Sequence, residues 1–291
     1  MKEKIAVVCA PGIGDGLILH VASHNLVQMG YEVTTFNDHL EGFGKWLHGY
    51  RFAKQPELEK IEEILSHFDA VILQHDNTPK SKKVREWRGK VFGFLGSHRI
   101  SKHGALSDLD YVCDPSRTMV DNIARATARW FGAATKENGL TSPAGLVHRK
   151  NLRRIAIHST SGAAEKNWPQ EKFTIVAEKL KKEGYNPVFI ANRGKPLFPT
   201  LEELASFLYE SGSFLGNDSG PGHIASCLKI PSLVIGKEEK QMRLWAPGWL
   251  APEIAVPPRW SSQWRWARAK WKYFITTRNV IKKLKEKVLK N

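Results

Sequence analysis

The stretch GNDSGPGHIAS at residues 216–226 decides the fold, because it joins a buried strand to a helix through a tight turn. Gly220 and Gly222 let the backbone approach a ligand closely, and the amides at the start of the helix favour a phosphate. The carboxylate of Asp218 cannot bind that phosphate, but it can accept hydrogen bonds from sugar hydroxyls or cap the helix. A nucleotide-sugar carries both groups and therefore fits both features of this turn.

Strands and helices are predicted to alternate on either side of the turn. Short apolar or β-branched runs predict strands, and amphipathic stretches bounded by caps predict helices. The first half is expected to have strands at 4–10, 31–37, 69–75 and 90–96, and helices at 15–30, 56–68 and 114–132, the last capped by Asp114. The second half is expected to have strands at 153–159, 186–191, 213–218 and 231–236, and helices at 169–184, 200–211 and from Gly220. This alternation predicts an α/β protein with two Rossmann-like, doubly wound halves that face a cleft.

Two further turns follow predicted strands and carry polar side chains. The turn APGIGDG at 10–16 contains Asp15, whose carboxylate could either cap the next helix or act as a general base in the cleft. The segment at 158–173 contains Thr160, Ser161 and Lys166, which form either a phosphate cradle or an ordinary polar loop.

Metal and disulfide chemistry is not expected. The three cysteines, Cys9, Cys113 and Cys227, lie in or beside apolar stretches without Cys-x-x-Cys spacing, which predicts free thiols in a reducing cytoplasm. His20 and His24 are four residues apart, but no acidic partner completes a metalloprotease pattern. The longest early apolar run, at 5–10, is too short to span a membrane, so we read residues 1–20 as a first strand and turn.

The net charge of +15 is concentrated near the C-terminus. Residues 259–291 contain eleven Lys or Arg against one acid, with four tryptophans among them, and residues 79–90 contain six basic residues. Basic patches attract nucleic acid, anionic lipid or phosphorylated substrates, and a solvated basic face is the plainer alternative. Tryptophans favour a contact with membrane or nucleic acid, although no nucleic-acid-binding motif is present.

The sequence resembles a known family, the ADP-heptose lipopolysaccharide heptosyltransferases of glycosyltransferase family 9. The segment at 200–236 is similar to the family signature, and the segment at 154–173 is similar to its phosphate-binding segment. The residues GIGDGLILH at 12–20 and RLWAPG at 243–248 match two shorter elements. The resemblance implies the GT-B fold and an inverting, metal-independent transfer of a sugar, with no cofactor.

The resemblance also implies roles for individual residues. Asp15 would be the base that deprotonates the acceptor hydroxyl, and Asp218 would bind the donor sugar. Thr160, Ser161, Lys166, Ser219 and Gly220 would bind the donor diphosphate, with Gly14 and His223 as further residues of the cleft. The partners would be ADP-heptose and a phosphorylated, lipid-linked saccharide at an anionic membrane surface, and not nucleic acid. The protein would then be cytoplasmic or peripheral on the inner face of the cytoplasmic membrane.

These roles imply a division of the chain. An acceptor-binding domain is expected at 1–134, a linker at 135–151 and a nucleotide-sugar-binding domain at 152–258. Basic helices at 259–291 are expected to pack back on the first domain.

Two segments depart from the family pattern. Only residues 192–199 join a strand and a helix that the family separates by a further helix and strand, and KEEKQM at 237–242 replaces a different turn. The sequence therefore leaves open a nucleotide-sugar donor other than ADP-heptose. A nucleotide-sugar epimerase of similar fold and, more remotely, a nucleic-acid-binding protein are the alternative functions.

Overall fold

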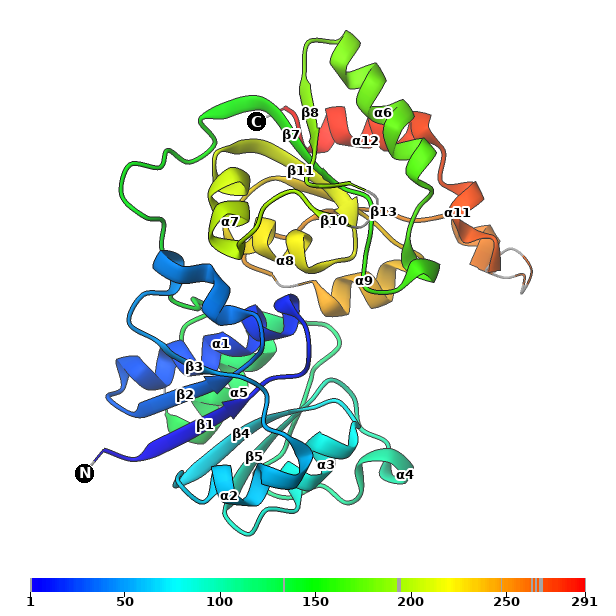
Figure 1. The fold of residues 1–291 in the computed structure, drawn as a ribbon. Helices are drawn as coiled ribbons and strands as arrows, with labels where there is room; N and C mark the ends of the chain where they lie inside the picture. The colour runs from blue at the N-terminus through cyan, green and yellow to red at the C-terminus, as the bar shows by residue number, and fades with distance from the viewer. Residues whose placement is uncertain are drawn as a thin grey trace. The chain divides into compact units, whose positions relative to one another are not determined.

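The computed structural model describes residues 2–132, 134–192, 195–246, 248–262, 264, 266 and 269–290. The chain divides into two compact units, Met1–Thr141 and Ser142–Asn291, and each contains a parallel sheet with helices on both faces (Figure 1). The predicted α/β class with two Rossmann-like units is confirmed. No described helix is long and apolar enough to cross a membrane.

The sheet of the first unit has the order β3-β2-β1-β4-β5-β6, and all its strand pairs are parallel. The strands are β1 (Lys4–Val8), β2 (Glu32–Phe36), β3 (Arg51–Ala53), β4 (Ala70–His75), β5 (Lys90–Leu95) and β6 (Tyr111–Val112). The helices are α1 (Ile13–Gln28), η1 (Leu40–Leu47), η2 (Leu58–Lys60), α2 (Ile61–Leu65), α3 (Pro79–Arg85), α4 (Ile100–His103) and α5 (Met119–Phe131). The strand order reverses between β1 and β4, which is the point where such sheets bind ligands.

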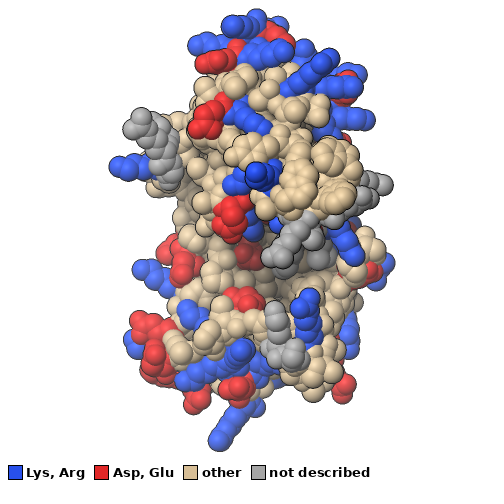
Figure 2. Space-filling model, turned by 90° about the vertical axis from the view of Figure 1, so that its right-hand side faces the viewer, with Lys and Arg blue, Asp and Glu red and all other residues tan. Residues whose placement is uncertain are grey.

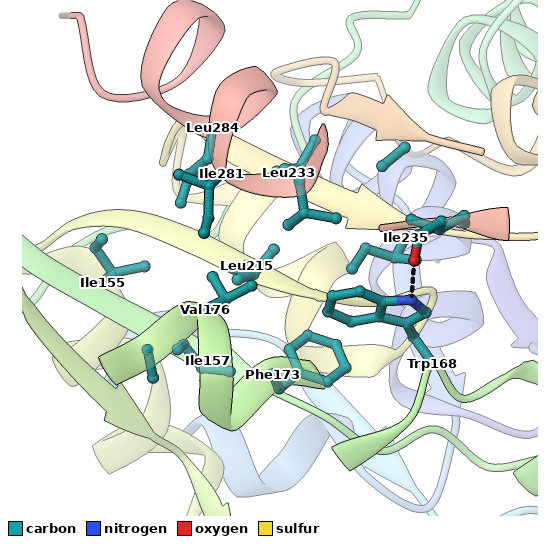
Figure 3. Close-up of a cluster of buried hydrophobic side chains, with 14 of the residues drawn as sticks. Ile155, Ile157, Trp168, Phe173, Val176, Leu215, Leu233, Ile235, Ile281 and Leu284 are labelled. Carbon is teal, nitrogen blue, oxygen red and sulfur yellow. Dashed lines mark hydrogen bonds between the residues drawn. The ribbon is translucent and has the colours of Figure 1, made fainter. Parts of the chain in front are cut away.

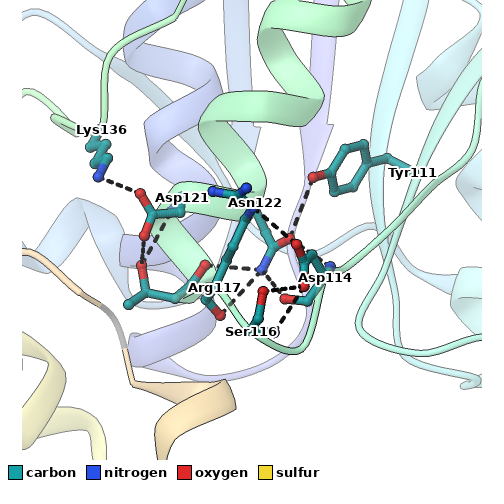
Figure 4. Close-up of polar contacts among 8 residues, drawn as sticks. Tyr111, Asp114, Ser116, Arg117, Asp121, Asn122 and Lys136 are labelled. Carbon is teal, nitrogen blue, oxygen red and sulfur yellow. Dashed lines mark hydrogen bonds and ion pairs between the residues drawn. The ribbon is translucent and has the colours of Figure 1, made fainter.

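The helix predicted at 114–132 begins later than expected. Its N-cap is Thr118, whose hydroxyl accepts a hydrogen bond from the backbone N–H of Asp121. Asp114 instead closes a turn before the helix, where its carboxylate accepts hydrogen bonds from Ser116 and Arg117 (Figure 4). Both residues are good caps, and the sequence pattern did not distinguish a capped turn from a capped helix.

The sheet of the second unit has the order β13-β12-β11-β7-β8 and is also parallel. The strands are β7 (Asn151–His158), β8 (Asn186–Phe189), β11 (Ser211–Asn217), β12 (Ser232–Ile235) and β13 (Glu253–Ala255), and a small hairpin pairs β9 (Ala191–Asn192) with β10 (Lys195–Pro196). The helices are η3 (Ala164–Lys166), α6 (Gln170–Lys182), α7 (Leu201–Tyr209), α8 (Gly220–Cys227), α9 (Glu239–Trp245), η4 (Arg259–Ser262), α11 (Trp271–Phe274) and α12 (Thr277–Lys287).

The apolar stripe of α12 belongs to the core of the second unit. Ile281 and Leu284 pack in one cluster with Ile155, Leu233 and Trp168 (Figure 3). The sequence analysis expected the helices at 259–291 to pack on the first domain, which stays a prediction, whereas within the second unit this stripe is buried in the unit's own core. A helix with an apolar stripe must bury it, but the stripe does not specify which surface will cover it.

Residues within the predicted linker are held to the first unit. The backbone N–H of Thr135 donates to Asn25 Oδ1 at 2.6 Å, and Asn138 Nδ2 donates to the carbonyl of Leu17 at 3.2 Å. Because Asn25 and Leu17 both lie on α1, residues 135 and 138 extend the first unit beyond α5. The second sheet begins at Asn151.

Candidate active site

The strand order of the second sheet reverses between its neighbours β7 and β11. Polar side chains gather where these two strands end: His158 is the last residue of β7, and Ser219 follows β11 as the N-cap of α8. Gly216 pairs with His158 across the two strands, and a side chain at Gly216 would meet the His158 carbonyl oxygen at 2.9 Å. The glycine of the quoted stretch therefore lets the two strands approach closely beneath the polar group.

His158 links the two predicted phosphate-binding segments. Its Nδ1 lies 2.9 Å from Ser219 Oγ, and its Nε2 lies 3.3 Å from Thr160 Oγ1. Burial lowers the pKa of His158 from 6.5 to about 4, so the ring is neutral near pH 7. A neutral imidazole has one donor and one acceptor nitrogen, and it therefore orients the two hydroxyls in opposite senses.

The amide of Asn217 holds the loop after β7 against the loop after β11. Asn217 Nδ2 donates to the Ser159 carbonyl at 2.7 Å, and Asn217 Oδ1 accepts from the backbone N–H of Trp168 at 2.9 Å. The side chain is fully buried, so both bonds are shielded from water. Ser161 Oγ donates within the same loop, to Asn167 Oδ1 at 2.6 Å.

A pocket of about 290 Å³ brings Lys166 and Asp218 together. Ile235, Met242 and Trp271 supply apolar parts of its wall, at the end of β12, on α9 and on α11. Lys237 adds a second cation to the lining, and Glu165 and Glu238 add two carboxylates to that of Asp218. The pocket thus combines charged groups of both signs with an apolar wall, which is a composition found in small-molecule sites.

The C-terminal segment fixes the loop that carries Lys166. Trp168 Nε1 donates to the carbonyl of Ile275 at 3.1 Å, as the dashed line in Figure 3 shows. Lys272 Nζ donates to the carbonyl of Ala164 at 3.0 Å. These contacts connect residues about a hundred positions apart in sequence, so the tail of the chain helps to build the pocket.

The other predicted residues after β11 follow Asp218 in the chain but are not among the residues that line this pocket. Ser219 caps α8 by position only, since its side chain makes no cap hydrogen bond and faces His158 instead. Gly220 is the first residue of α8. His223 Nε2 lies 3.9 Å from Asp218 Oδ1, so these two side chains are neighbours.

In the first unit, Asp15 lies in the first turn of α1, next to Gly14. Gln74 Nε2 donates to Asp15 Oδ1 at 2.8 Å, and Gln74 Oε1 accepts from the backbone N–H of Ala10 at 3.2 Å. Gln74 and Asp76 line a pocket of about 360 Å³ where β1 and β4 end. Asp15 is therefore held beside a pocket at the reversal of the strand order.

Sequence reasoning missed several residues of these sites. His158, Asn217, Gln74 and Met242 were given no role in either site. Trp271 was counted among the tryptophans expected at a membrane or nucleic-acid surface, but it is buried and lines the pocket. Three of these residues could have been found from their place in the sequence, because His158, Gln74 and Asn217 each lie at or next to the end of a predicted strand. Among the described residues, no group of three or more His, Cys, Asp or Glu side chains could hold a metal ion.

The fold and site together define a class of structure, the GT-B fold with two Rossmann-like units. Similar folds occur in solved structures of glycosyltransferases. E. coli ADP-heptose lipopolysaccharide heptosyltransferase II is 15% identical with a TM-score of 0.68, covering 98% of each chain. The glycosyltransferase of family 9 from Veillonella parvula is 16% identical with a TM-score of 0.68, covering 99% of this chain and 98% of that one. E. coli heptosyltransferase WaaC with ADP is 14% identical with a TM-score of 0.67, covering 98% of this chain and 100% of that one.

Sequence comparison adds no further match. No family model and no curated protein matches the chain. The iron-containing glycosyltransferase TibC of E. coli is also similar in structure, at 11% identity and a TM-score of 0.58, covering 98% of this chain and 76% of that one. These likenesses confirm the predicted GT-B fold.

Proposed function

We propose that this protein is an inverting glycosyltransferase that transfers heptose from ADP-heptose to a lipopolysaccharide core acceptor. The observation that carries the proposal is the pocket in which Lys166 and Asp218 meet beside the start of α8. A nucleotide-sugar presents a diphosphate and hydroxyl groups within one small molecule, and this pocket offers a partner for each. The solved structure that is named as an ADP-heptose heptosyltransferase has a similar fold, and it is this fold that positions the pocket.

The donor diphosphate lies between the two loops that His158 connects. Lys166, the hydroxyls of Thr160 and Ser219 and the backbone at Gly220 supply positive charge and hydrogen bonds. Ser161 acts through its loop, because its hydroxyl already donates to Asn167. Asp218 accepts hydrogen bonds from sugar hydroxyls, with His223 beside it.

The apolar wall of the pocket takes the nucleoside. Met242 and Trp271 offer a polarisable side chain and an aromatic one, which suit a flat base. Met242 belongs to the segment 237–242 that departs from the family pattern, so this segment is where donor preference is set. The proposal of ADP-heptose is therefore tested most directly by comparing donors with different bases.

Asp15 supplies the general base for the acceptor hydroxyl. Inverting transfer needs one base on the acceptor and stabilisation of charge on the leaving diphosphate. The hydrogen bond from Gln74 fixes the carboxylate in one orientation. The acceptor, a phosphorylated and lipid-linked saccharide, binds the first unit.

Transfer proceeds without a metal ion in this proposal, because Lys166 and the start of α8 neutralise the leaving group. Turnover in EDTA tests this point. Full activity in the chelator supports it, and activity restored only by an added divalent cation or iron contradicts it.

A thermal-shift comparison tests the donor site. ADP and ADP-heptose should raise the melting temperature, whereas UDP and UDP-sugars should raise it less. Lys166→Ala should reduce the shift with ADP, because a charged contact to the diphosphate is lost. Lys179→Ala, an exposed lysine on α6, is the matched control.

Two outcomes would contradict the donor proposal. An equal shift for Lys166→Ala and the wild type would remove Lys166 from the site. Isomerisation of the sugar-nucleotide without any acceptor would favour an epimerase.

A further inference from the structure

Four large aromatic side chains near the C-terminus face solvent. Trp260, Trp264, Trp266 and Tyr273 are 51%, 57%, 57% and 70% exposed, and we call them the aromatic surface. Trp271, within the same segment, is only 3% exposed and lines the candidate donor pocket. The segment therefore buries one aromatic side chain and presents four others outward.

Two of the four exposed rings belong to one group. Trp260 and Trp266 both contact Phe274, with ring centroids 5.1 Å and 6.1 Å apart and T-shaped geometry. Isolated exposed apolar residues need no explanation, but a contiguous group of them marks an interaction site. Indole and phenol rings also carry a polar group, which suits the boundary between water and hydrocarbon.

The sequence around these rings is strongly basic. Residues 259–291 contain eleven Lys or Arg and one acid, Glu286. The face on which α11 lies shows uncharged surface that is bordered by Lys and Arg and, on one side, by Asp and Glu (Figure 2). The excess of basic residues favours a partner with negative charge, which anionic phospholipid headgroups such as phosphatidylglycerol provide.

We infer that the aromatic surface docks this protein on an anionic bilayer, with the rings at headgroup depth and the basic side chains on the lipid phosphates. The inference rests on the proposed function, since a lipid-linked acceptor is presented at such a surface. It also assigns the contact to the aromatic surface, in the same segment as Trp271, which lines the donor pocket.

The lysines of α12 are a weaker basis for this contact than the sequence suggested. Lys285 forms an ion pair with Glu183 at 2.9 Å, and Lys283 Nζ donates to the carbonyl of Ile254. Both lysines thus hold α12 to its own unit. Lys282 and Lys287 are exposed on this helix and can add only general attraction.

Single-stranded RNA is the competing partner, because aromatic and basic residues also bind nucleic acid. Bases stack on flat, accessible ring faces along a strand. Here Trp260 and Trp266 meet Phe274 at interplanar angles of 77° and 62°, so their rings form a compact cluster rather than a row of parallel faces. The geometry favours insertion into an interface.

Vesicle co-sedimentation of the full chain tests the inference. The wild type should bind phosphatidylcholine vesicles that contain phosphatidylglycerol, and should bind pure phosphatidylcholine far less. The double variant Trp260→Ser with Trp266→Ser should bind the anionic vesicles about tenfold more weakly or worse, because it removes the two grouped rings from the contact. High salt should weaken binding of the wild type.

The matched control is Leu152→Ser with Ile175→Ser, which removes two exposed apolar side chains elsewhere in the same unit. This control should bind like the wild type. A second comparison, Lys282→Gln with Lys287→Gln, should reduce binding less than the aromatic variant does. Circular dichroism and the thermal shift with ADP confirm that each variant is folded.

The possible results separate this inference from the proposed function. Wild type that stays in the supernatant at low salt, or equal losses for the aromatic variant and its control, overturns the membrane contact. Saturable RNA binding without vesicle binding overturns it in favour of nucleic acid. If vesicles bind but no nucleotide-sugar raises the melting temperature, the docking surface stands and the proposed function fails.

Discussion

At the residue scale, His158 is the centre of the candidate donor site. It contacts a hydroxyl from each of two loops, and its ring is neutral near pH 7 because it is buried. Protonation would turn the accepting nitrogen into a second donor and would reverse the one hydrogen bond in which a hydroxyl donates to the ring. The imidazole therefore contributes geometry, while the positive charge of the site comes from Lys166 and the start of α8.

The stability of the second unit should depend on pH through His158. Its pKa is 6.5 in the unfolded chain and about 4 in the folded one, so between these values the unfolded chain binds more protons. The contribution is fully present above pH 6.5 and is lost as the pH falls toward 4, by about 3 kcal/mol in total. Urea unfolding from pH 7 downward measures it.

His158→Gln removes the titrating group and keeps a side chain that hydrogen-bonds. The variant should lose less stability than the wild type over the same pH range. Parallel pH curves for the two proteins would show that His158 does not titrate as its burial requires.

Asp15 and Gln74 act as a pair at the residue scale. Asp15→Asn should lower kcat by about 100-fold while the thermal shift with ADP-heptose is unchanged, because the general base is lost but the donor site is intact. Gln74→Leu should lower kcat less than Asp15→Asn does and should alter the pH profile of kcat, because the Asp15 carboxylate loses the hydrogen bond that orients it. Near-normal turnover of Asp15→Asn would exclude Asp15 as the base.

At the scale of elements, the loop between β7 and α6 owes its shape to other parts of the chain. Asn217 holds it from β11, and Lys272 and Ile275 hold it from the C-terminal segment. The loop is polar and has only one short 3₁₀ turn of its own, at η3. Its conformation, and with it the position of Lys166, therefore depends on these long-range bonds.

Asn217→Ala should weaken both folding and donor binding. The change leaves a buried carbonyl at Ser159 and a buried N–H at Trp168 without their partner, at a cost of about 1–3 kcal/mol each. The melting temperature and the affinity for ADP should both fall. Asn186→Ala, at an exposed position of β8, is the control and should change neither. Unchanged ADP affinity in a destabilised Asn217→Ala would mean that the loop does not position the donor.

At the scale of the whole molecule, each unit has its own sheet and its own core. The second core includes the last helix, α12, so the unit is complete only when the chain reaches that helix. The first unit closes earlier, with residues after α5 that bind α1. Each candidate site lies where the strand order of its sheet reverses, in keeping with the rule for open parallel sheets.

Leu284→Ala should destabilise the second unit selectively. The side chain is fully buried in the cluster with Ile155 and Trp168, so its truncation should cost about 2–5 kcal/mol. Hydrogen exchange should show faster opening of β7 and β11, with β1 and β4 unchanged. Lys282→Ala on the exposed side of α12 should leave both units as they are. Equal effects on both units would mean that α12 also supports the first one.

The sequence by itself determined the strands of four or more residues, their order and the turns that carry the site, but not the short strands β3, β6, β9, β10 and β13. Buried β-branched runs such as IAVV and SLVI at 5–8 and 232–235 form strands because their apolar character leaves few alternatives. Lys166 and Asp218 could be assigned to one site from their places after predicted strands and from the family resemblance. The structure then placed them in one pocket.

Only the tertiary structure decided which surfaces meet. The apolar stripe of α12 could be predicted from the spacing of its apolar residues. The surface that covers the stripe could not be predicted, because the hydrophobic effect is non-directional. The contact of His158 with Ser219 depends on the parallel register of β7 and β11, which brings together residues sixty-one positions apart. The direction in which each tryptophan of the C-terminal segment points was also undetermined, since Trp271 and Trp264 have similar basic neighbours in sequence and opposite exposure in the fold. Local sequence fixes the conformational preference of a segment, whereas packing against distant segments fixes the direction of its side chains.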